Sequence, residues 1–364
     1  MIPIDTRLRD HAPGATLNRY GMDRSGEKTY AFNSLGYRGE EYNPDAKIKF
    51  AVVGCSNVFG TGLNQEETLG HHFKTFLAAA NGLELSEVNC FNFGVGGTSN
   101  EYGARTILSQ VEENLFDLVI FNLTPAGRWE YLDEEGFHSV KVGSVDPEAL
   151  DKLPPYVAAY YDLHNYALGN LMTIKNILLV QFFLRQIGTP LIISNDWSPL
   201  KNVKNPALQP LVDLVDHSIV HNHKFRSQRA DSAADGTHVG PITNKAAAIT
   251  LLRFYGGLLG RKSDAAQMRR IETYYEEALS QDPDWLFCQA RAKSGRKNLA
   301  IAIRAAEEAI ALRPDNRFAQ LQLRKLRSQI EKREGKQQMP KKGQRKGNKS
   351  AATNAGKGAE VTSE

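Results

Sequence analysis

Short apolar segments alternate with longer segments of helical periodicity along the middle of the chain, and no other feature limits the fold as strongly. The expected strands lie at 47–53, 88–93, 118–123 and 190–194. The expected helices lie at 66–80, 100–113, 156–186 (one helix or two) and 244–259. Parallel strands need crossover connections, which are usually helices. The alternation therefore predicts an α/β fold, a three-layer α/β/α sandwich around a parallel sheet. In such sheets ligands bind beyond the carboxyl ends of the strands.

The composition divides the 364 residues into four parts. An irregular N-terminal arm is expected at 1–46, and the α/β domain follows at 47–260. Residues 264–332 show helical periodicity only and are expected to form a small helical unit. Residues 333–364 are rich in Lys, Gly, Gln and Ser, a composition typical of disordered segments.

The helical unit contains an internal repeat. Segment 274–284 resembles segment 306–316: Ala278 and Ala309 are 31 positions apart, and so are Pro283 and Pro314. Small residues at the helix crossing and a proline after the second helix resemble degenerate tetratricopeptide repeats. Because two such units are too few to stand alone, 264–332 is expected to dock on the α/β domain or on a protein partner. The alternative is a pair of amphipathic helices that only cap the domain.

Charge gathers at the C-terminal end of the chain. Residues 331–364 contain nine basic and four acidic residues, while the whole chain carries a net charge of +4. The rest of the chain is therefore close to neutral. Nucleic acid is not expected as a partner, apart from weak contact through the basic tail. A solubilising extension is the other interpretation of the tail.

The three cysteines and the apolar segments indicate a reduced, cytoplasmic protein. Cys55, Cys90 and Cys288 are odd in number and have no metal-like spacing, which argues against a disulfide framework. The N-terminus shows no apolar export segment. The most apolar stretch, 171–193, is interrupted by Lys175, Gln181, Arg185 and Pro190. No membrane span is therefore predicted.

Three segments that follow expected strands or precede expected helices carry the side chains and backbone groups needed for acyl transfer. Gly54-Cys55-Ser56 offers a serine, and 92–99 offers a glycine-rich turn with backbone N–H donors. Asp235-Gly236-Thr237-His238 offers a histidine with a carboxylate three residues before it. A nucleophile, an oxyanion site and an oriented base are the components of this chemistry.

The same segments resemble a known family. Gly54-Cys55-Ser56, Asn92-x-Gly94-x-Gly96-Gly97 and Asp235-x-x-His238 resemble the first, second and fifth sequence blocks of the SGNH/GDSL hydrolases. Segment 33–39 is similar to one often found ahead of the nucleophile block. The resemblance covers roughly 30–260 and implies an SGNH/flavodoxin-like fold and a serine hydrolase. The chain has no G-x-S-x-G elbow, which removes the ordinary α/β-hydrolase alternative.

The resemblance assigns a role to each residue. Ser56 becomes the nucleophile, and His238 becomes its general base, oriented by Asp235. A histidine suits this role because its ordinary pKa of about 6.5 lies near neutral pH. The N–H groups of Ser56 and Gly97 become the oxyanion donors. The structural alternatives are a helix-capping serine, a turn aspartate beside a surface histidine, and a glycine required only by a tight turn.

Two positions depart from the family pattern. Cys55 stands where members usually have an aspartate that supports the turn. Ala126 stands where the third block usually has an asparagine, so the side-chain oxyanion donor is missing. Removing one such donor costs about 10²–10³-fold in rate. Asn57 and Asn100 are the candidate substitutes.

Arg128 lies two residues after the missing asparagine, and two interpretations of it stay open. In the first interpretation Arg128 binds an anionic group of the substrate. In the second it pairs with Glu130 or Asp133 at the surface.

Two further groups of residues are weaker candidates. His217 and His221 have i,i+4 spacing, so on a helix they would share one face, with His223 close by. That face is either a metal site or, as we expect, a solvated polar face. Segment 196–198, Asp-Trp-Ser, either lines the pocket or forms a loop with one buried aromatic residue.

The sequence thus predicts a serine hydrolase that cleaves an ester bond of a small molecule or carbohydrate through an acyl-enzyme. No metal and no organic cofactor is required. One alternative is a catalytically weakened SGNH-fold protein that binds a partner through 264–332. Another is an O-acyltransferase or deacetylase that acts on carbohydrate.

Overall fold

The computed structural model describes most of the chain between Tyr30 and Leu312. The described residues are 16–17, 30–134, 136–141, 155–195, 200, 205–222, 229–261, 264–293 and 299–312, with short pieces between 314 and 331. The expected tail at 333–364, most of the expected arm, segment 196–198 and His223 lie outside these residues.

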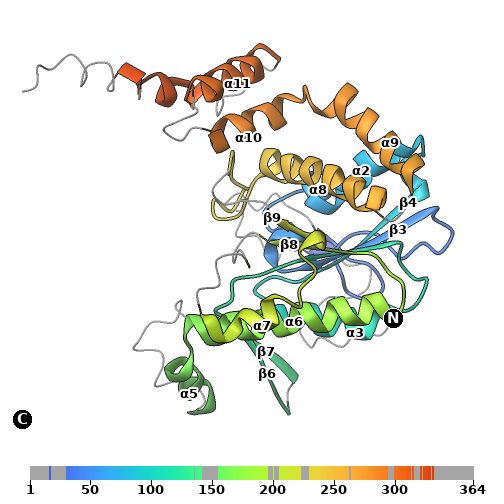
Figure 1. Ribbon diagram of the computed structural model, residues 1–364, viewed down its shortest axis with the longest axis vertical. Coiled ribbons are helices and arrows are strands. Elements are labelled where there is room, and N and C mark those ends of the chain that lie inside the picture. The colour runs from blue at the N-terminus through green and yellow to red at the C-terminus, as the bar shows by residue number, and fades with distance from the viewer. Residues whose placement is uncertain are drawn as a thin grey trace, which may run out of the picture.

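A parallel five-stranded sheet forms the centre of the molecule (Figure 1). Its strands, in spatial order, are β4 (Val88–Gly94), β3 (Ile48–Gly54), β5 (Leu118–Asn122), β8 (Leu191–Asn195) and β9 (Val220–Asn222). The four strands expected from the sequence are present within a residue or two of their predicted bounds. β9 was not predicted, because three residues are too few to show a periodic pattern.

Helices cover both faces of this sheet, which confirms the three-layer α/β prediction (Figure 1). On one face lie α2 (Leu69–Asn81) and α8 (Pro241–Arg261). On the other face lie α3 (Asn100–Gln110) and α6 (Tyr166–Gln186). The segment expected to hold one or two helices holds two, since α5 (Pro155–Leu163) precedes α6.

Shorter elements connect these layers. The described ones are β1 (Thr16–Leu17), β2 (Tyr30–Ala31), α1 (Ser56–Phe59), β6 (Arg128–Asp133), β7 (Gly136–Lys141), α7 (Gln209–Val212) and the 3-10 turns at Gln65–Glu67, Leu85–Glu87, Pro206–Leu208 and His217–Ile219. β6 and β7 form an antiparallel hairpin apart from the main sheet. This hairpin was not predicted from the sequence.

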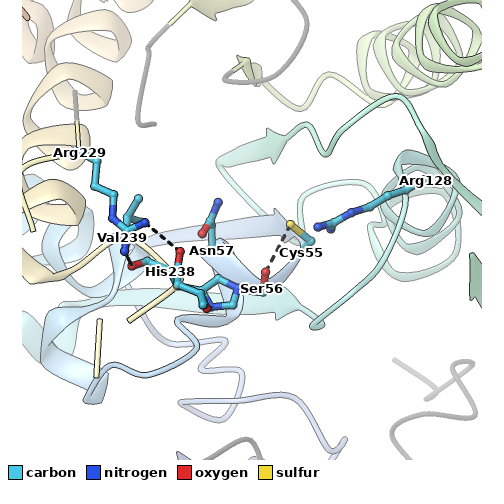
Figure 2. A pocket seen from close by; sticks show the side chains of 8 residues that line it. Cys55, Ser56, Asn57, Arg128, Arg229, His238 and Val239 are labelled. Atoms are coloured by element: carbon cyan, nitrogen blue, oxygen red, sulfur yellow. Dashed lines mark hydrogen bonds between the residues drawn. The ribbon is translucent and has the colours of Figure 1, made fainter. Parts of the chain in front are cut away.

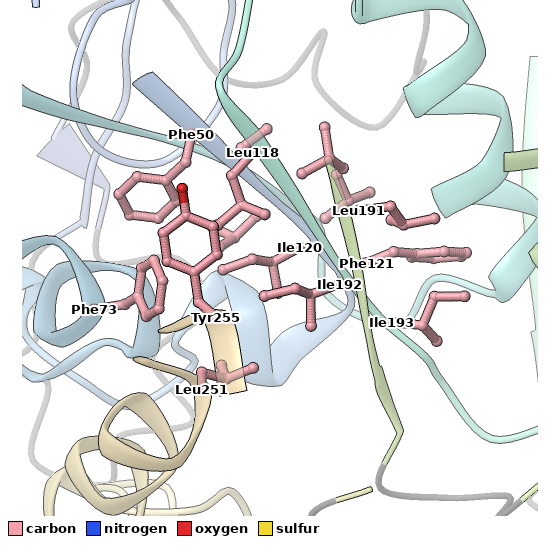
Figure 3. Close-up of a cluster of buried hydrophobic side chains, with 14 of the residues drawn as sticks. Phe50, Phe73, Leu118, Ile120, Phe121, Leu191, Ile192, Ile193, Leu251 and Tyr255 are labelled. Carbon is pink, nitrogen blue, oxygen red and sulfur yellow. The ribbon is translucent and has the colours of Figure 1, made fainter. Parts of the chain in front are cut away.

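The core lies between the sheet and its helices, and it follows the alternation of side chains along each strand. Ile120 and Ile192 point towards the α2/α8 layer, where they lie near Tyr255 (Figure 3). Phe121 and Ile193, the next residues along their strands, point to the opposite face. All five side chains are almost fully buried, as expected for a parallel sheet covered on both faces.

α6 is the one described helix that is long and apolar enough to cross a membrane by length and composition. Half of its most apolar window is buried inside the protein. Ile174, Ile177 and Leu184 belong to the main core, and α6 packs against α3. In this structure α6 therefore serves as a core helix of the sandwich.

The C-terminal helices lie on the outer side of α8, the first and second of them in contact with α8 and the last packed on the helix before it (Figure 1). They comprise α9 (Ala265–Tyr274), a π-helical turn (Tyr275–Leu279), α10 (Pro283–Lys293) and α11 (Leu299–Leu312). Ile271 and Tyr275 join the main core. Lys245 of α8 forms ion pairs with Asp282 and Asp284 at the start of α10. The resemblance to tetratricopeptide repeats and a protein partner for this unit stay predictions.

The histidine cluster does not have the geometry expected from its spacing. His217 begins a 3-10 turn, whereas His221 lies in β9. The prediction that the two histidines share one helix face is therefore wrong, because the chain changes from turn to strand between the two residues. Among the described residues, no group of three or more potential ligands could hold a metal ion.

His221 makes the stability of the fold sensitive to acid. Its ring is buried against Phe254, and burial lowers its pKa to about 4. The unfolded chain, with a histidine pKa near 6.5, binds more protons than the folded chain between these two values. The stability linked to His221 is thus fully present above pH ~6.5 and lost as the pH falls towards 4.

We expect the free energy of unfolding to fall by roughly 1–3 kcal/mol between pH 7 and 4.5 on account of His221. Urea titrations at several pH values measure this loss. His221→Phe should make the acid slope shallower, while His217→Phe, at an exposed position, should leave it unchanged. An identical slope in wild type and His221→Phe would contradict the assignment.

Candidate active site

The nucleophile segment and the glycine turn meet because the two central strands end level with each other. Gly54 of β3 pairs with Gly94 of β4 at the end of the parallel ladder. A Cβ at Gly94 would lie 2.3 Å from the backbone N of Phe59. Only glycine therefore allows α1, which begins at Ser56, to approach the end of β4.

Polar side chains hold this turn in place. The Asn92 amide donates to the Val58 carbonyl at 3.0 Å, and its oxygen accepts from Gly94 N–H at 2.8 Å. The Thr98 hydroxyl, fully buried, donates to the Val95 carbonyl at 2.8 Å. Buried hydrogen bonds thus fix the geometry of the turn that carries Ser56.

Asp235 and His238 form a hydrogen-bonded pair. Asp235 Oδ2 accepts from His238 Nδ1, and Asp235 Oδ1 accepts from the His238 N–H at 2.9 Å. The Thr237 hydroxyl also donates to Asp235, at 2.8 Å. Because a carboxylate can only accept, Nδ1 carries the proton, and the Nε2 lone pair is left to act as a base.

The same hydrogen bonds keep Asp235 ionised. Burial alone would raise the pKa of its carboxyl, but the hydrogen bonds from His238 and Thr237 outweigh burial and lower that pKa below its ordinary value. The Asp235 side chain is 1% exposed. A buried carboxylate in contact with an imidazole stabilises the imidazolium that forms during proton transfer.

Arg229 anchors the loop that carries this pair. Its guanidinium donates to the carbonyls of Gly236, Thr237 and His238 at 2.9–3.0 Å and to the Ser232 hydroxyl at 2.6 Å. A single side chain thereby fixes the backbone on both sides of the histidine. Arg229 was not predicted as a site residue, because its acceptors are mostly backbone carbonyls, which carry no residue-type signal.

A direct contact ties the histidine loop to the nucleophile loop. The Ala234 N–H donates to the Gly62 carbonyl at 3.0 Å. Gly62 has φ +74, and a Cβ there would lie 3.0–3.2 Å from Ala233, Ala234 and Asp235. The two loops, far apart in the sequence, are therefore packed together six residues after Ser56.

These loops enclose a pocket of about 450 Å³ (Figure 2), a size typical of small-molecule sites. The lining residues are Cys55, Ser56, Asn57, Arg128, Arg229, Thr237, His238 and Val239. The His238 ring is turned towards Ser56 (Figure 2). Within the described residues, no hydrogen bond joins the Ser56 hydroxyl to this ring; the hydroxyl instead faces the Cys55 sulfur at 3.9 Å.

The structure thus brings Ser56, Asn57, Arg128 and His238 to one pocket, but Gly97 and Asn100 do not line it. Gly97 has φ +85, a conformation that suits the tight-turn alternative.

The Asn100 side chain is buried and already fully engaged. Its amide nitrogen donates to the Thr124 carbonyl and the Thr173 hydroxyl, both at 3.1 Å. Its oxygen accepts from Thr124 N–H at 2.8 Å. With these three bonds Asn100 fixes the backbone after β5, so it is not placed to replace the oxyanion donor that Ala126 lacks.

Arg128 does not pair with Glu130, one of the two surface partners that the sequence suggested. Glu130 instead accepts two hydrogen bonds from Arg105 of α3, at 3.0 and 3.2 Å. Asp133 lies at the far end of β6, in the hairpin turn. Arg128 reaches the pocket, where it donates to the Thr98 carbonyl at 3.1 Å.

All three cysteines are free and buried, as expected for a chain without a disulfide framework. Cys55 lines the pocket beside Ser56. Cys90 is buried in the core, and burial strongly raises the pKa of its thiol.

Comparisons with known proteins add little to this geometry. No protein-family model matches the chain, and no curated protein matches it. Among solved structures, the lipase/acylhydrolase from Enterococcus faecalis is similar over 57% of this chain and 94% of its own, with 16% sequence identity and a TM-score of 0.31. A likeness at that TM-score carries no weight for the function.

Proposed function

We propose that the protein is a serine hydrolase that cleaves ester bonds, with Ser56 as nucleophile, His238 as general base and Asp235 as the residue that orients the base. The observation that carries this proposal is the convergence of Ser56 and the Asp235–His238 pair on one pocket. They come from segments almost two hundred residues apart, and a purely structural role for each would not require that convergence.

In the proposed reaction His238 Nε2 accepts the proton of the Ser56 hydroxyl as the oxygen attacks the ester carbonyl. Rotation about χ1 of Ser56 moves the hydroxyl from the Cys55 sulfur to the imidazole. Catalytic hydrogen bonds of this kind commonly form only when the substrate binds. The imidazolium then returns the proton to the leaving alcohol. Water, deprotonated by the same imidazole, then attacks the acyl-enzyme, and the imidazolium returns that proton to the Ser56 oxygen as the acid is released.

The tetrahedral oxyanion is proposed to accept a hydrogen bond from the N–H group of Ser56, whereas Gly97, which does not line the pocket, keeps the tight-turn interpretation. As the first residue of α1, Ser56 has no acceptor for its N–H within that helix. Ala126 stands where the third sequence block of the family usually has an asparagine, so the amide side chain that would be a further oxyanion donor is missing. The turnover number should therefore be about 10²–10³-fold below that of a complete oxyanion site.

Labelling by a fluorophosphonate probe tests this proposal. The probe reacts with activated serines, so it should label the wild-type protein and fail to label Ser56→Ala. p-Nitrophenyl acetate and butyrate should be hydrolysed by the wild type only. Thr75→Ala, which removes a hydroxyl on α2 outside the pocket, is the matched control and should keep both properties. Full labelling of folded Ser56→Ala would exclude Ser56 as the nucleophile.

A further inference from the structure

Arg128 enters the pocket from the side opposite His238, with its guanidinium turned towards Cys55 (Figure 2). It begins β6 directly after the loop that follows β5. Ser56 therefore lies between an imidazole on one side and a cation on the other. The reaction proposed above uses the imidazole and assigns nothing to the cation.

The charge of Arg128 is not neutralised by any described carboxylate. Among the described residues its one hydrogen bond goes to the Thr98 carbonyl, at 3.1 Å, which leaves most of the five N–H donors of a guanidinium unused. The nearest acidic neighbour in the strand, Glu130, is held by Arg105. An arginine placed in a pocket with open donors is suited to a planar or tetrahedral anion.

The other charged groups at the pocket do not compensate for Arg128. Arg229 donates to backbone carbonyls and to a hydroxyl, so it adds positive charge. No Asp or Glu belongs to the described lining of the pocket. Asp235, the carboxylate next to the pocket residue His238, is hydrogen-bonded to that histidine. The electrostatic field in the pocket is thus positive on the side of Arg128.

We propose that Arg128 binds an anionic group, a carboxylate or a phosphate, carried by the ester substrate. This inference rests on the proposed ester hydrolysis and specifies its substrate class. The anion accepts hydrogen bonds from the guanidinium while the ester carbonyl lies at Ser56. Esters of dicarboxylic acids, or esters whose alcohol part carries a phosphate, have this arrangement of groups.

A matched pair of esters tests the proposal. The mono-p-nitrophenyl ester of succinate and the p-nitrophenyl ester of 4-methylpentanoate have similar shapes, but only the first carries a carboxylate. The wild type should prefer the succinate ester by kcat/KM. In Arg128→Gln the ratio of kcat/KM for the succinate ester to kcat/KM for the neutral ester should fall about 10–100-fold. This is the effect expected from losing a hydrogen bond to a charged group. Arg128→Lys should retain part of the preference.

Arg304→Gln is the control for net charge, because Arg304 is exposed on α11, and it should leave the ratio unchanged. Inhibition of the neutral ester by succinate or by inorganic phosphate tells which anion fits better. Thermal melts check that each variant is folded. An unchanged ratio in folded Arg128→Gln would overturn the proposal. An equal loss of kcat on both esters would also overturn it, since Arg128 would then act on the oxyanion.

Failure of this inference is distinct from failure of the proposed function. If the wild type cleaves neither ester, the hydrolase proposal fails. Binding of succinate to the wild type and to Arg128→Gln, measured by calorimetry, would still decide whether Arg128 recognises an anion.

Discussion

Replacing His238 with alanine is expected to lower kcat for ester hydrolysis by about 10⁴-fold or more. A serine hydroxyl is a weak nucleophile until a base removes its proton. His238 is the described histidine that lines the pocket with Ser56, and its Nδ1–H is fixed by Asp235. The measurement is the hydrolysis of p-nitrophenyl butyrate at neutral pH, with active-site titration to exclude contaminating esterase.

The double variant Ser56→Ala/His238→Ala gives a sharper test than either single change. Residues that act as one catalytic unit are strongly non-additive, so the double variant should be no slower than each single variant. His217→Ala removes an exposed histidine outside the pocket and should retain the activity of the wild type. Losses that simply multiply in the double variant, or activity of His238→Ala within tenfold of the wild type, would contradict the triad.

Most of the central fold could be predicted from the sequence, because hydrophobic periodicity reports burial directly. The strands ending at Gly54 and Gly94 are almost wholly buried, and such strands read as continuous apolar runs. β9 is too short for this signal. The hairpin β6–β7 does show alternation, with Trp129 and Tyr131 on one face, but an isolated hairpin has no neighbouring crossover helices to support the prediction.

The candidate site could be predicted in part, where one residue type carries the chemistry. Ser56, Asp235 and His238 are visible because a hydroxyl, a carboxylate and an imidazole are needed together. The supports of the site could not be predicted. Arg229 and Arg38 bind backbone carbonyls, and every residue has a carbonyl. Which carbonyl faces an arginine depends on the tertiary fold alone.

Replacing Arg38 with methionine is expected to destabilise the protein by roughly 3–5 kcal/mol. Arg38 is 1% exposed and lies in the segment 33–39 ahead of the nucleophile segment. Its guanidinium donates to the carbonyls of Phe59, Gly60 and Leu63 at 2.9, 2.6 and 2.7 Å. It also stacks over the Tyr30 ring at 4.3 Å. Methionine fills similar volume but leaves three carbonyls without these donors.

The charge of Arg38 persists in its buried position. Burial lowers its pKa to about 10, so the guanidinium stays protonated at neutral pH and its hydrogen bonds are charge-assisted. Arg38→Lys retains the charge but cannot reach three carbonyls with one ammonium in the same geometry. It should therefore recover only part of the lost stability. Urea unfolding at pH 7 measures both variants.

The loop that Arg38 holds, from Phe59 to Leu63, begins at the last residue of α1, the short helix that starts at Ser56. Gly62 in this loop also accepts the N–H of Ala234 from the histidine loop. Loss of Arg38 should thus lower kcat as well as stability, because the segment that carries Ser56 and the loop that carries His238 both contact this turn. Arg304→Met, at an exposed arginine of α11, should change neither quantity. A loss of less than about 1 kcal/mol in Arg38→Met would show that the loop holds its shape without the guanidinium.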